Sequence, residues 1–293
     1  MHNKIFGIYK KDGKKIINIL GIKIKIKTKK EKCIEKNVIN NIGRLLSIAF
    51  LHQKTFAGFK NKHDKETIVL LGAGPTLNSF SPLKKAVYVG LNRTFLFDKV
   101  KLSYLFAIDK AGIENYYEEF SDYVGANCIK FIGDQNLGKN YQISESYFNK
   151  LTNARHYMTT SGFMDNKIAL NIETEPLANF CTVSLQAMQF ILYTNPDKIY
   201  LVGIDCNMTK AGHFVGKSFD NSKRNENSQI NDDNSIIYWK RMKEFTDCYY
   251  PNTEIISVNP VGLKGIFKDV YTKEYLKDHP EINPDEVEIL ECK

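Results

Sequence analysis

The pattern of apolar and polar positions changes near residue 67 and divides the chain into two regions. From there onward, short apolar runs recur, and each is followed by Gly, Asp or Asn. Short runs bounded by such turn-forming residues are typical of buried strands. The runs are TIVLLG, AVYVGLN, LSYLFAID, NCIKFIGD, KIYLVGID and TEIISVNP.

Segments with apolar residues at helical spacing separate several of these runs, most clearly VSLQAMQFILYT and SIIYWKRMKEFTDCYY. Buried strands that alternate with helices predict an α/β protein with a Rossmann-like, mostly parallel sheet and helices on both faces. We expect this domain to span residues 67–270, followed by a tail with a short helix at residues 271–293. The polar segment 216–235 predicts a loop that can close over an active site.

The region before residue 67 predicts a small β-hairpin followed by a helix. Ile and Lys alternate from Ile22 in LGIKIKIK, which favours a strand with one apolar and one cationic face. An Asp-Gly pair precedes it and is typical of a tight turn, so we expect a hairpin over residues 4–28. Residues 37–59 predict an amphipathic helix that packs against the main domain or lies on a membrane. Its apolar positions are Val38, Ile42, Leu45, Leu46, Ala49 and Phe50.

The positive charge of the chain is concentrated in this first region. Residues 1–66 contain 17 Lys and Arg against 5 Asp and Glu, a net charge of +12, whereas the remainder carries −4. Nucleic acid, the anionic cytoplasmic leaflet of a membrane, and a merely solubilising surface are three explanations. Lysines also protect an exposed strand against aggregation. No aromatic residues are interleaved with the alternating Lys23, Lys25 and Lys27 of the hairpin, so nucleic acid is the least favoured partner.

Several other features exclude classes of protein. No apolar run approaches the roughly 18 residues that a helix needs to span a bilayer. The first residues, MHNKIFGIYKKDGKK, lack the apolar core and the cleavage site of a secretory signal. The six cysteines are scattered without a CxxC pair, which disfavours a zinc site or a disulfide framework and fits a reducing compartment. We therefore expect a cytoplasmic protein.

The first strand of the main domain ends in the loop Gly72-Ala73-Gly74-Pro75-Thr76. Glycines let backbone amides approach an anion closely, and Pro75 can begin a helix whose free N–H groups point at a phosphate. The loop lacks the Lys of a Walker A sequence and the third glycine of the dinucleotide fingerprint. A plain strand-to-helix turn is an equal alternative.

Polar residues follow other strands as well. Asn92 and Arg93 follow AVYVGL, Asp109 follows LSYLFAI, and Asp205 follows KIYLVGI, with His213 eight residues further on. Because parallel strands end at the same edge of a sheet, we expect these side chains to converge on one crevice. The alternatives are a turn cap for Asn92, helix N-caps for the two aspartates, and simple exposure for His213.

The segment FCTVSLQAMQF offers a second anion site. Thr182 or Ser184 can cap the helix that follows, and the free amides of that helix would then attract a phosphate or a sugar carboxylate. Capping alone is a sufficient explanation for both residues.

The stretches GAGPTLN, GLN, CTVSLQAMQF, IYLVGID, GHF and ISVNPVGLKGIF resemble the MptE-like domain family, named after an archaeal hydroxymethylpterin diphosphokinase. Most bacterial members belong to surface-polysaccharide and flagellar glycosylation clusters. The same frame is similar to the small bacterial sialyltransferases that use CMP-sialic acid, over roughly residues 67–268. The LGIKIKIK segment resembles the leading segment of many lipopolysaccharide and capsule glycosyltransferases.

The resemblance implies that Gly72, Gly74, Pro75 and Thr76 line the nucleotide phosphates, that Asn92 contacts the phosphate or leaving group, and that Thr182 and Ser184 lie near the donor. The chain departs from the sialyltransferases in three places. Ala73 replaces an Asn between the loop glycines, two phosphate-binding tyrosines fall near Asn207 and His213, and their catalytic histidine falls near Asn234.

Together these features predict a metal-independent glycosyltransferase that uses a CMP-activated sugar in surface glycan assembly. His213 and Asp205 are the candidate catalytic residues, with His213 as the general base, since the ordinary pKa of histidine suits that task. Asp205 or Asp109 would orient the acceptor, and Arg93 would assist as a cation. The chain has no D-x-D motif for a metal, and no cofactor is expected.

The partners of such an enzyme would be a nucleotide-sugar donor, a glycan or lipid-linked acceptor, and the inner membrane, which it would contact through the lysine-rich hairpin. Assembly into a homo-oligomer is a further alternative. Two alternative functions remain. One is a pterin-type diphosphokinase with ATP and Mg²⁺, and the other is a non-catalytic scaffold that binds a glycan or a nucleotide.

Overall fold

The structure, a computed structural model, describes most of the chain. The described residues are 6–11, 14–19, 22–26, 29–108, 113, 116–125, 127–134, 148–160, 167–180, 182–207, 212–214 and 226–291. The chain forms two compact units, Met1–Phe50 and Leu51–Lys293. The boundary between them falls inside helix α1 (Lys29–Phe56), 16 residues before the boundary that the sequence pattern predicts.

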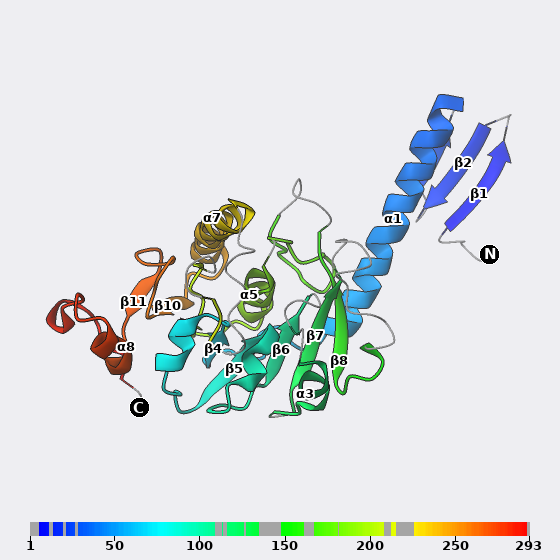
Figure 1. The fold of residues 1–293 in the computed structure, drawn as a ribbon. Coiled ribbons are helices and arrows are strands. Elements are labelled where there is room, and N and C mark those ends of the chain that lie inside the picture. Colours follow the sequence, from blue (N-terminus) through cyan, green and yellow to red (C-terminus); the bar gives the residue numbers. More distant parts are fainter. Residues whose placement is uncertain are drawn as a thin grey trace. The chain divides into compact units, whose positions relative to one another are not determined.

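The first unit contains a three-stranded antiparallel sheet in the order β1-β2-β3 and the larger part of α1 (Figure 1). The strands are β1 (Phe6–Lys11), β2 (Lys14–Ile19) and β3 (Ile22–Ile26). The expected hairpin over residues 4–28 is therefore a three-stranded meander. Ile8, Ile17 and Ile24 lie opposite one another across the strands and share one face of the sheet.

The second unit is built on an eight-stranded parallel sheet in the order β11-β10-β9-β4-β5-β6-β7-β8. This arrangement confirms the predicted α/β, Rossmann-like fold with a mostly parallel sheet (Figure 1). The strands are β4 (Thr67–Leu71), β5 (Ala86–Leu91), β6 (Tyr104–Ala107), β7 (Ile129–Asp134), β8 (Ala154–Met158), β9 (Lys198–Val202), β10 (Glu254–Val258) and β11 (Lys268–Val270).

Alternate residues of the central strands enter two separate hydrophobic cores, one on each face of the sheet. On β4, Ile68 and Leu70 join the core formed with α5 (Val183–Tyr193) and α7 (Glu226–Tyr249). Val69 and Leu71 join the opposite core. That core also contains side chains from α3 (Tyr117–Asp122) and from the short 3-10 helices η1 (Pro75–Ser79) and η2 (Asn92–Leu96). Apolar residues on both faces explain why the central strands appear as continuous apolar runs.

The order of the strands identifies the edge at which a ligand would bind. From β4 the chain builds β5 to β8 on one side and then returns through α5 to build β9 to β11 on the other, so the direction reverses between β4 and β9. In open parallel sheets, ligands occupy the crevice at the carboxyl ends next to such a reversal. The last residues of α5 accept hydrogen bonds from the segment before β4, with Asn61 N to Tyr193 O at 3.1 Å. The amino terminus of α5 therefore lies at the carboxyl edge.

One segment differs from the sequence prediction, and the tail agrees with it in containing a short helix. The polar segment 216–235 was expected to be a loop, but α7 begins at Glu226, so its second half is helical; residues 215–225 lie outside the described part. The tail contains α8 (Lys273–Asp278) and η4 (Pro284–Glu286), and Tyr271 pairs with Ile289 in a β-bridge. Within the described ranges, none of the helices combines the length and apolar composition needed to traverse a bilayer.

A buried histidine, His52, bonds to two backbone groups inside the second unit. His52 is fully buried, its Nδ1 lies 2.8 Å from the Ile172 carbonyl, and its Nε2 lies 2.8 Å from the Met158 amide. One nitrogen must donate and the other must accept, so these contacts fit the neutral ring. Burial lowers the pKa of His52 below its ordinary value.

This depressed pKa predicts a loss of stability in mild acid. The unfolded chain takes up a proton near pH 6.5, whereas the folded chain resists it, so the His52 contribution is complete above that pH and is lost as pH falls through the folded pKa. We expect the free energy of unfolding, measured with urea between pH 7.5 and 5, to fall by about 1.4 kcal/mol for each unit of depression. His52→Gln should flatten this slope. His279→Gln, the same substitution at a histidine of the tail, is the comparison; an equal slope in both variants would exclude His52 as its source.

Candidate functional site

The loop after β4 and the end of β9 are interlocked through glycines. Gly72 N donates to Val202 O at 2.7 Å, and Gly74 N donates to Gly203 O at 2.9 Å. A Cβ atom on Gly72 would collide with the Gly203 carbonyl oxygen, and one on Gly203 would collide with the Gly72 carbonyl oxygen. Gly203 also has a φ of +67°, which favours glycine. The two backbones therefore touch directly at the point where the sheet reverses direction.

Asp205 fastens the start of η1 to the end of β9. The Thr76 amide donates to one carboxylate oxygen at 3.2 Å, and the Thr76 hydroxyl donates to the other. Burial raises the pKa of Asp205, and the two bonds from Thr76 oppose that shift. Pro75 stands at the first position of η1, as the sequence predicts. Asp205 is not the N-cap residue of η1, which is Gly74; it holds Thr76 from a neighbouring strand end, and the donors of Thr76 are already engaged.

The loop offers fewer open amides than its glycines suggest. The amides of Gly72, Gly74, Thr76 and Leu77 all donate to oxygen atoms of the protein, and Leu77 N lies 3.1 Å from Gly74 O. Within the described part of the chain, the Ala73 amide has no protein acceptor. The sequence predicts several amides directed at a phosphate, but in this loop only the amide of Ala73 is open among the described residues.

His213 lies beside the same loop. The amide of the next residue, Phe214, donates to Ala73 O at 2.9 Å. The Phe214 ring packs edge-on against Phe97, with ring centroids 6.1 Å apart. These two contacts anchor the short described segment 212–214, in which His213 is half-buried. The structure therefore brings His213 to the glycine loop, 139 positions away along the chain.

Asn92 follows β5, the neighbour of β4, and it has an unusual environment. Its φ is +50°, and its side-chain Oδ1 is buried without a hydrogen-bond partner among the described residues. Buried polar atoms are nearly always paired, so an unpaired acceptor at this edge is available to a ligand. Arg93 is buried with its guanidinium 5.8 Å from the centre of the Tyr116 ring. Asp109 lies outside the described residues.

Thr182 and Ser184 form the amino-terminal cap of α5. The Thr182 hydroxyl accepts a bond from Ser184 N at 3.4 Å, and the two hydroxyl oxygens lie 2.9 Å apart. The capping alternative is thus confirmed for Thr182. The positive end of the helix dipole also lies at the carboxyl edge of the sheet, where it favours an anion.

Some residues of the predicted site are in direct contact in the structure, and others only share the same edge of the sheet. Gly74 and Thr76 lie against Asp205, and Phe214 ties His213 to Ala73. Asn92 and the cap of α5 share the same edge of the sheet through the strand order. Among the described residues, no group of three or more His, Cys, Asp or Glu could hold a metal ion.

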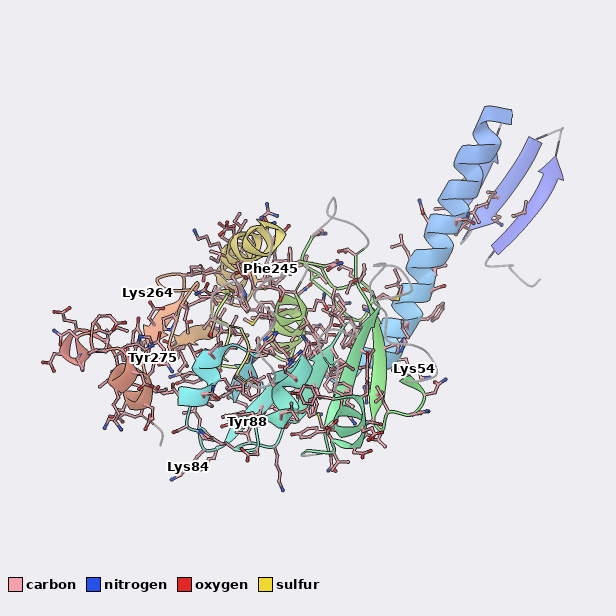
Figure 2. All side chains as sticks on the ribbon, viewed as in Figure 1. Lys54, Lys84, Tyr88, Phe245, Lys264 and Tyr275 are labelled. Atoms are coloured by element: carbon pink, nitrogen blue, oxygen red, sulfur yellow. The ribbon has the colours of Figure 1, made fainter. Side chains whose placement is uncertain are left out.

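Three contributions to this edge were not identified from the sequence. Gly203 and Phe214 belong to the motifs IYLVGID and GHF. Their position next to Asp205 and His213 is the sequence signal that points to them. Tyr275 belongs to α8, which packs against η1 (Figure 2). Burial raises the pKa of Tyr275, and the charge of Asp205 adds to that shift. No sequence signal points to Tyr275.

Comparison with solved structures finds distant matches to glycosyltransferases. The sialyltransferase CstII from Campylobacter jejuni, solved with the substrate analogue cytidine-5'-monophosphate, matches with a TM-score of 0.37 and 15% identity over 67% of this chain and 80% of that chain. The MAf glycosyltransferase from Magnetospirillum magneticum AMB-1 matches with a TM-score of 0.43 and 12% identity over 78% of this chain and 38% of that chain.

A further structure, the sialyltransferase CST-II in complex with trisaccharide acceptor and CMP, matches with a TM-score of 0.37 and 13% identity over 66% of this chain and 80% of that chain. No protein-family model matches the chain, and a search of curated proteins finds no match. Similarity at this level assigns neither an activity nor a substrate to this chain.

Proposed function

We propose that the chain is a cytoplasmic glycosyltransferase that takes its sugar from a CMP-activated donor and passes it to a glycan or lipid-linked acceptor in surface glycan assembly. The observation that carries the proposal is the glycine loop at the reversal of the sheet, with His213 tied to it and an unpaired Asn92 oxygen at the next strand end. The motif resemblance supports a CMP-sugar as the donor class.

The cap of α5 and the open amide of Ala73 would bind the donor phosphate without a metal ion. The hydroxyls of the cap and the backbone amide of Ala73 are donors held in place by the fold, so they would stabilise the charge that develops on the phosphate as the bond to the sugar breaks. The Asn92 oxygen is an acceptor, so it would take a hydrogen bond from a hydroxyl or amino group of the nucleotide. Its predicted role is thereby refined from phosphate contact to nucleotide contact.

In the proposed reaction an acceptor hydroxyl attacks the anomeric carbon of the donor. The bond from that carbon to the phosphate oxygen breaks, and its electron pair leaves with CMP. His213 takes the proton of the attacking hydroxyl as general base. Asp205 is a positioning residue here, because both of its oxygens are held by Thr76 and fix the loop.

Thermal unfolding with a panel of nucleotides tests the proposal. We expect CMP to stabilise the protein without Mg²⁺, by about 2.7 kcal/mol at a concentration one hundred times the dissociation constant. CDP, UDP, GDP and ATP should stabilise it less. Stabilisation by ATP that requires Mg²⁺ would instead support the diphosphokinase, and CMP binding without sugar transfer would support the scaffold.

A pair of asparagine variants locates the nucleotide. Asn92→Ala should raise the dissociation constant for CMP about tenfold or more, since it removes the unpaired acceptor. The stabilisation by CMP should fall accordingly. Asn153→Ala is the matched control, because Asn153 also has a positive φ, of 52°, but is exposed and precedes β8. Equal CMP affinity in the two variants would remove Asn92 from the site.

A further inference from the structure

The apolar side chains that remain exposed are concentrated in the first unit. Among the described residues, ten large hydrophobic side chains are exposed, and six of them lie within Met1–Phe50. On α1, Leu45 is 57% exposed, Leu46 is 54% exposed and Phe50 is 72% exposed. The other three are isoleucines of the small sheet, Ile8, Ile22 and Ile24. Exposed apolar groups gathered in one small unit indicate a surface that binds something.

The exposed residues of α1 form a continuous stripe. Successive residues of a helix are rotated by about 100°, so Leu45, Leu46 and Phe50 fall within an arc of about 140°. Ile42 and Ala49 fall inside the same arc and are half-buried. Ile48 points away from this arc and is buried. The helix therefore has one packed apolar side and a second apolar side that is left open.

The small sheet adds a second open apolar surface to the unit. Ile8 and Ile24 flank the buried Ile17 across the three strands, and Ile22 lies two residues along the same face of β3. β3 is an edge strand, and its lysines alternate with these isoleucines.

The charge of the unit indicates the chemistry of its partner. Residues 1–50 contain 13 Lys and Arg against 3 Asp and Glu, a net charge of +10, whereas the rest of the chain carries −2. A second copy of the same surface would repel it. An anionic lipid surface offers both complementary charge at its headgroups and an apolar boundary beneath them.

We propose that the first unit binds the surface of an anionic lipid bilayer. The stripe of Leu45, Leu46 and Phe50 enters the boundary between headgroups and acyl chains, and lysines of the same unit bind the lipid phosphates. This contact differs from the one predicted from the sequence, in which the lysine face of the hairpin acts alone. It concerns a surface apart from the nucleotide site and does not depend on the proposed activity.

Sedimentation of the full chain with lipid vesicles tests this binding. We expect the protein to bind vesicles that contain phosphatidylglycerol, to bind vesicles of phosphatidylcholine alone far more weakly, and to dissociate from the former in 1 M salt, where the screening length is about 3 Å. Equal binding to both kinds of vesicle would overturn the role of charge.

Two triple variants separate the apolar from the electrostatic part of the contact. Leu45→Gln with Leu46→Gln and Phe50→Gln should reduce binding to the level seen with phosphatidylcholine. Changing Lys23, Lys25 and Lys27 to Gln should weaken binding roughly a hundredfold. Each lysine near such a surface strengthens binding about fivefold, and the three factors multiply.

Matched variants of the second unit provide the controls. Ile237→Gln with Tyr249→Gln alters exposed apolar residues of α7, and the triple change of Lys84, Lys101 and Lys240 to Gln alters exposed lysines (Lys84 is labelled in Figure 2). These controls should bind vesicles as the native chain does. Undiminished binding by the α1 variant would overturn the proposal, as would a concentration-dependent dimer that the same variant dissociates.

Discussion

Replacing Gly72 by alanine is expected to abolish nucleotide binding and to lower the free energy of unfolding by roughly 3 kcal/mol or more. The added Cβ would collide with the Gly203 carbonyl, which belongs to the backbone of the adjacent strand end and cannot rotate away. Either β4 and β9 separate at their carboxyl ends, or the loop 72–75 is displaced together with the amide of Ala73. Urea unfolding and the thermal shift with CMP measure the two effects.

The control for this variant is Gly43→Ala in α1. A Cβ atom on Gly43 meets nothing within 4 Å, and alanine in a helix interior is favoured over glycine by up to about 1 kcal/mol. Gly43→Ala should therefore be neutral or stabilising, with unchanged CMP binding. A Gly72→Ala protein with native stability and native affinity for CMP would mean that the crossing of the two strands does not organise the site.

The central strands could be predicted from the sequence, whereas the edge strands could not. A central parallel strand such as β4 is buried on both faces, so its residues form an uninterrupted apolar run. β8 and β11 lie at the two ends of the sheet and carry polar residues, in ARHYM and KDV. Their pairing is determined by the strand beside them rather than by their own composition.

The edge that carries the candidate site could be predicted from strand order, but the bonds within it could not. Parallel strands end at one edge, so a polar residue after each strand could be assigned to that edge from the sequence alone. The bond between Thr76 and Asp205 joins residues 129 positions apart, and that between Phe214 and Ala73 joins residues 141 positions apart. Both depend on how two loops meet in space, which a periodic pattern does not encode.

The exposed apolar stripe of α1 is a further feature that the sequence pattern alone could not establish. The spacing of Leu45, Leu46 and Phe50 predicts an amphipathic helix equally well whether the apolar side is buried in the protein or binds a partner. Periodicity reports which residues share a face, and the exposed fractions in the folded chain then show that this face is open.

Replacing His213 by alanine is expected to lower kcat for sugar transfer by a factor of about 10² to 10⁴, the range that a general base usually supplies. Stabilisation by CMP should be unchanged, because the bond that ties segment 212–214 to the loop comes from the backbone of Phe214 rather than from the imidazole. Turnover of a CMP-sugar and the thermal shift with CMP, measured on the same preparation, separate the two effects.

Asp205→Ala provides the comparison, because it removes the acceptor of both Thr76 bonds and leaves His213 in place. This variant should lose CMP stabilisation and turnover together, whereas His213→Ala should lose turnover alone. A residue that only positions the loop raises KM and weakens nucleotide binding, while a base acts on the chemical step. Unaltered turnover in His213→Ala would remove the imidazole from the mechanism, and a parallel loss of CMP binding in both variants would reassign His213 to holding the loop.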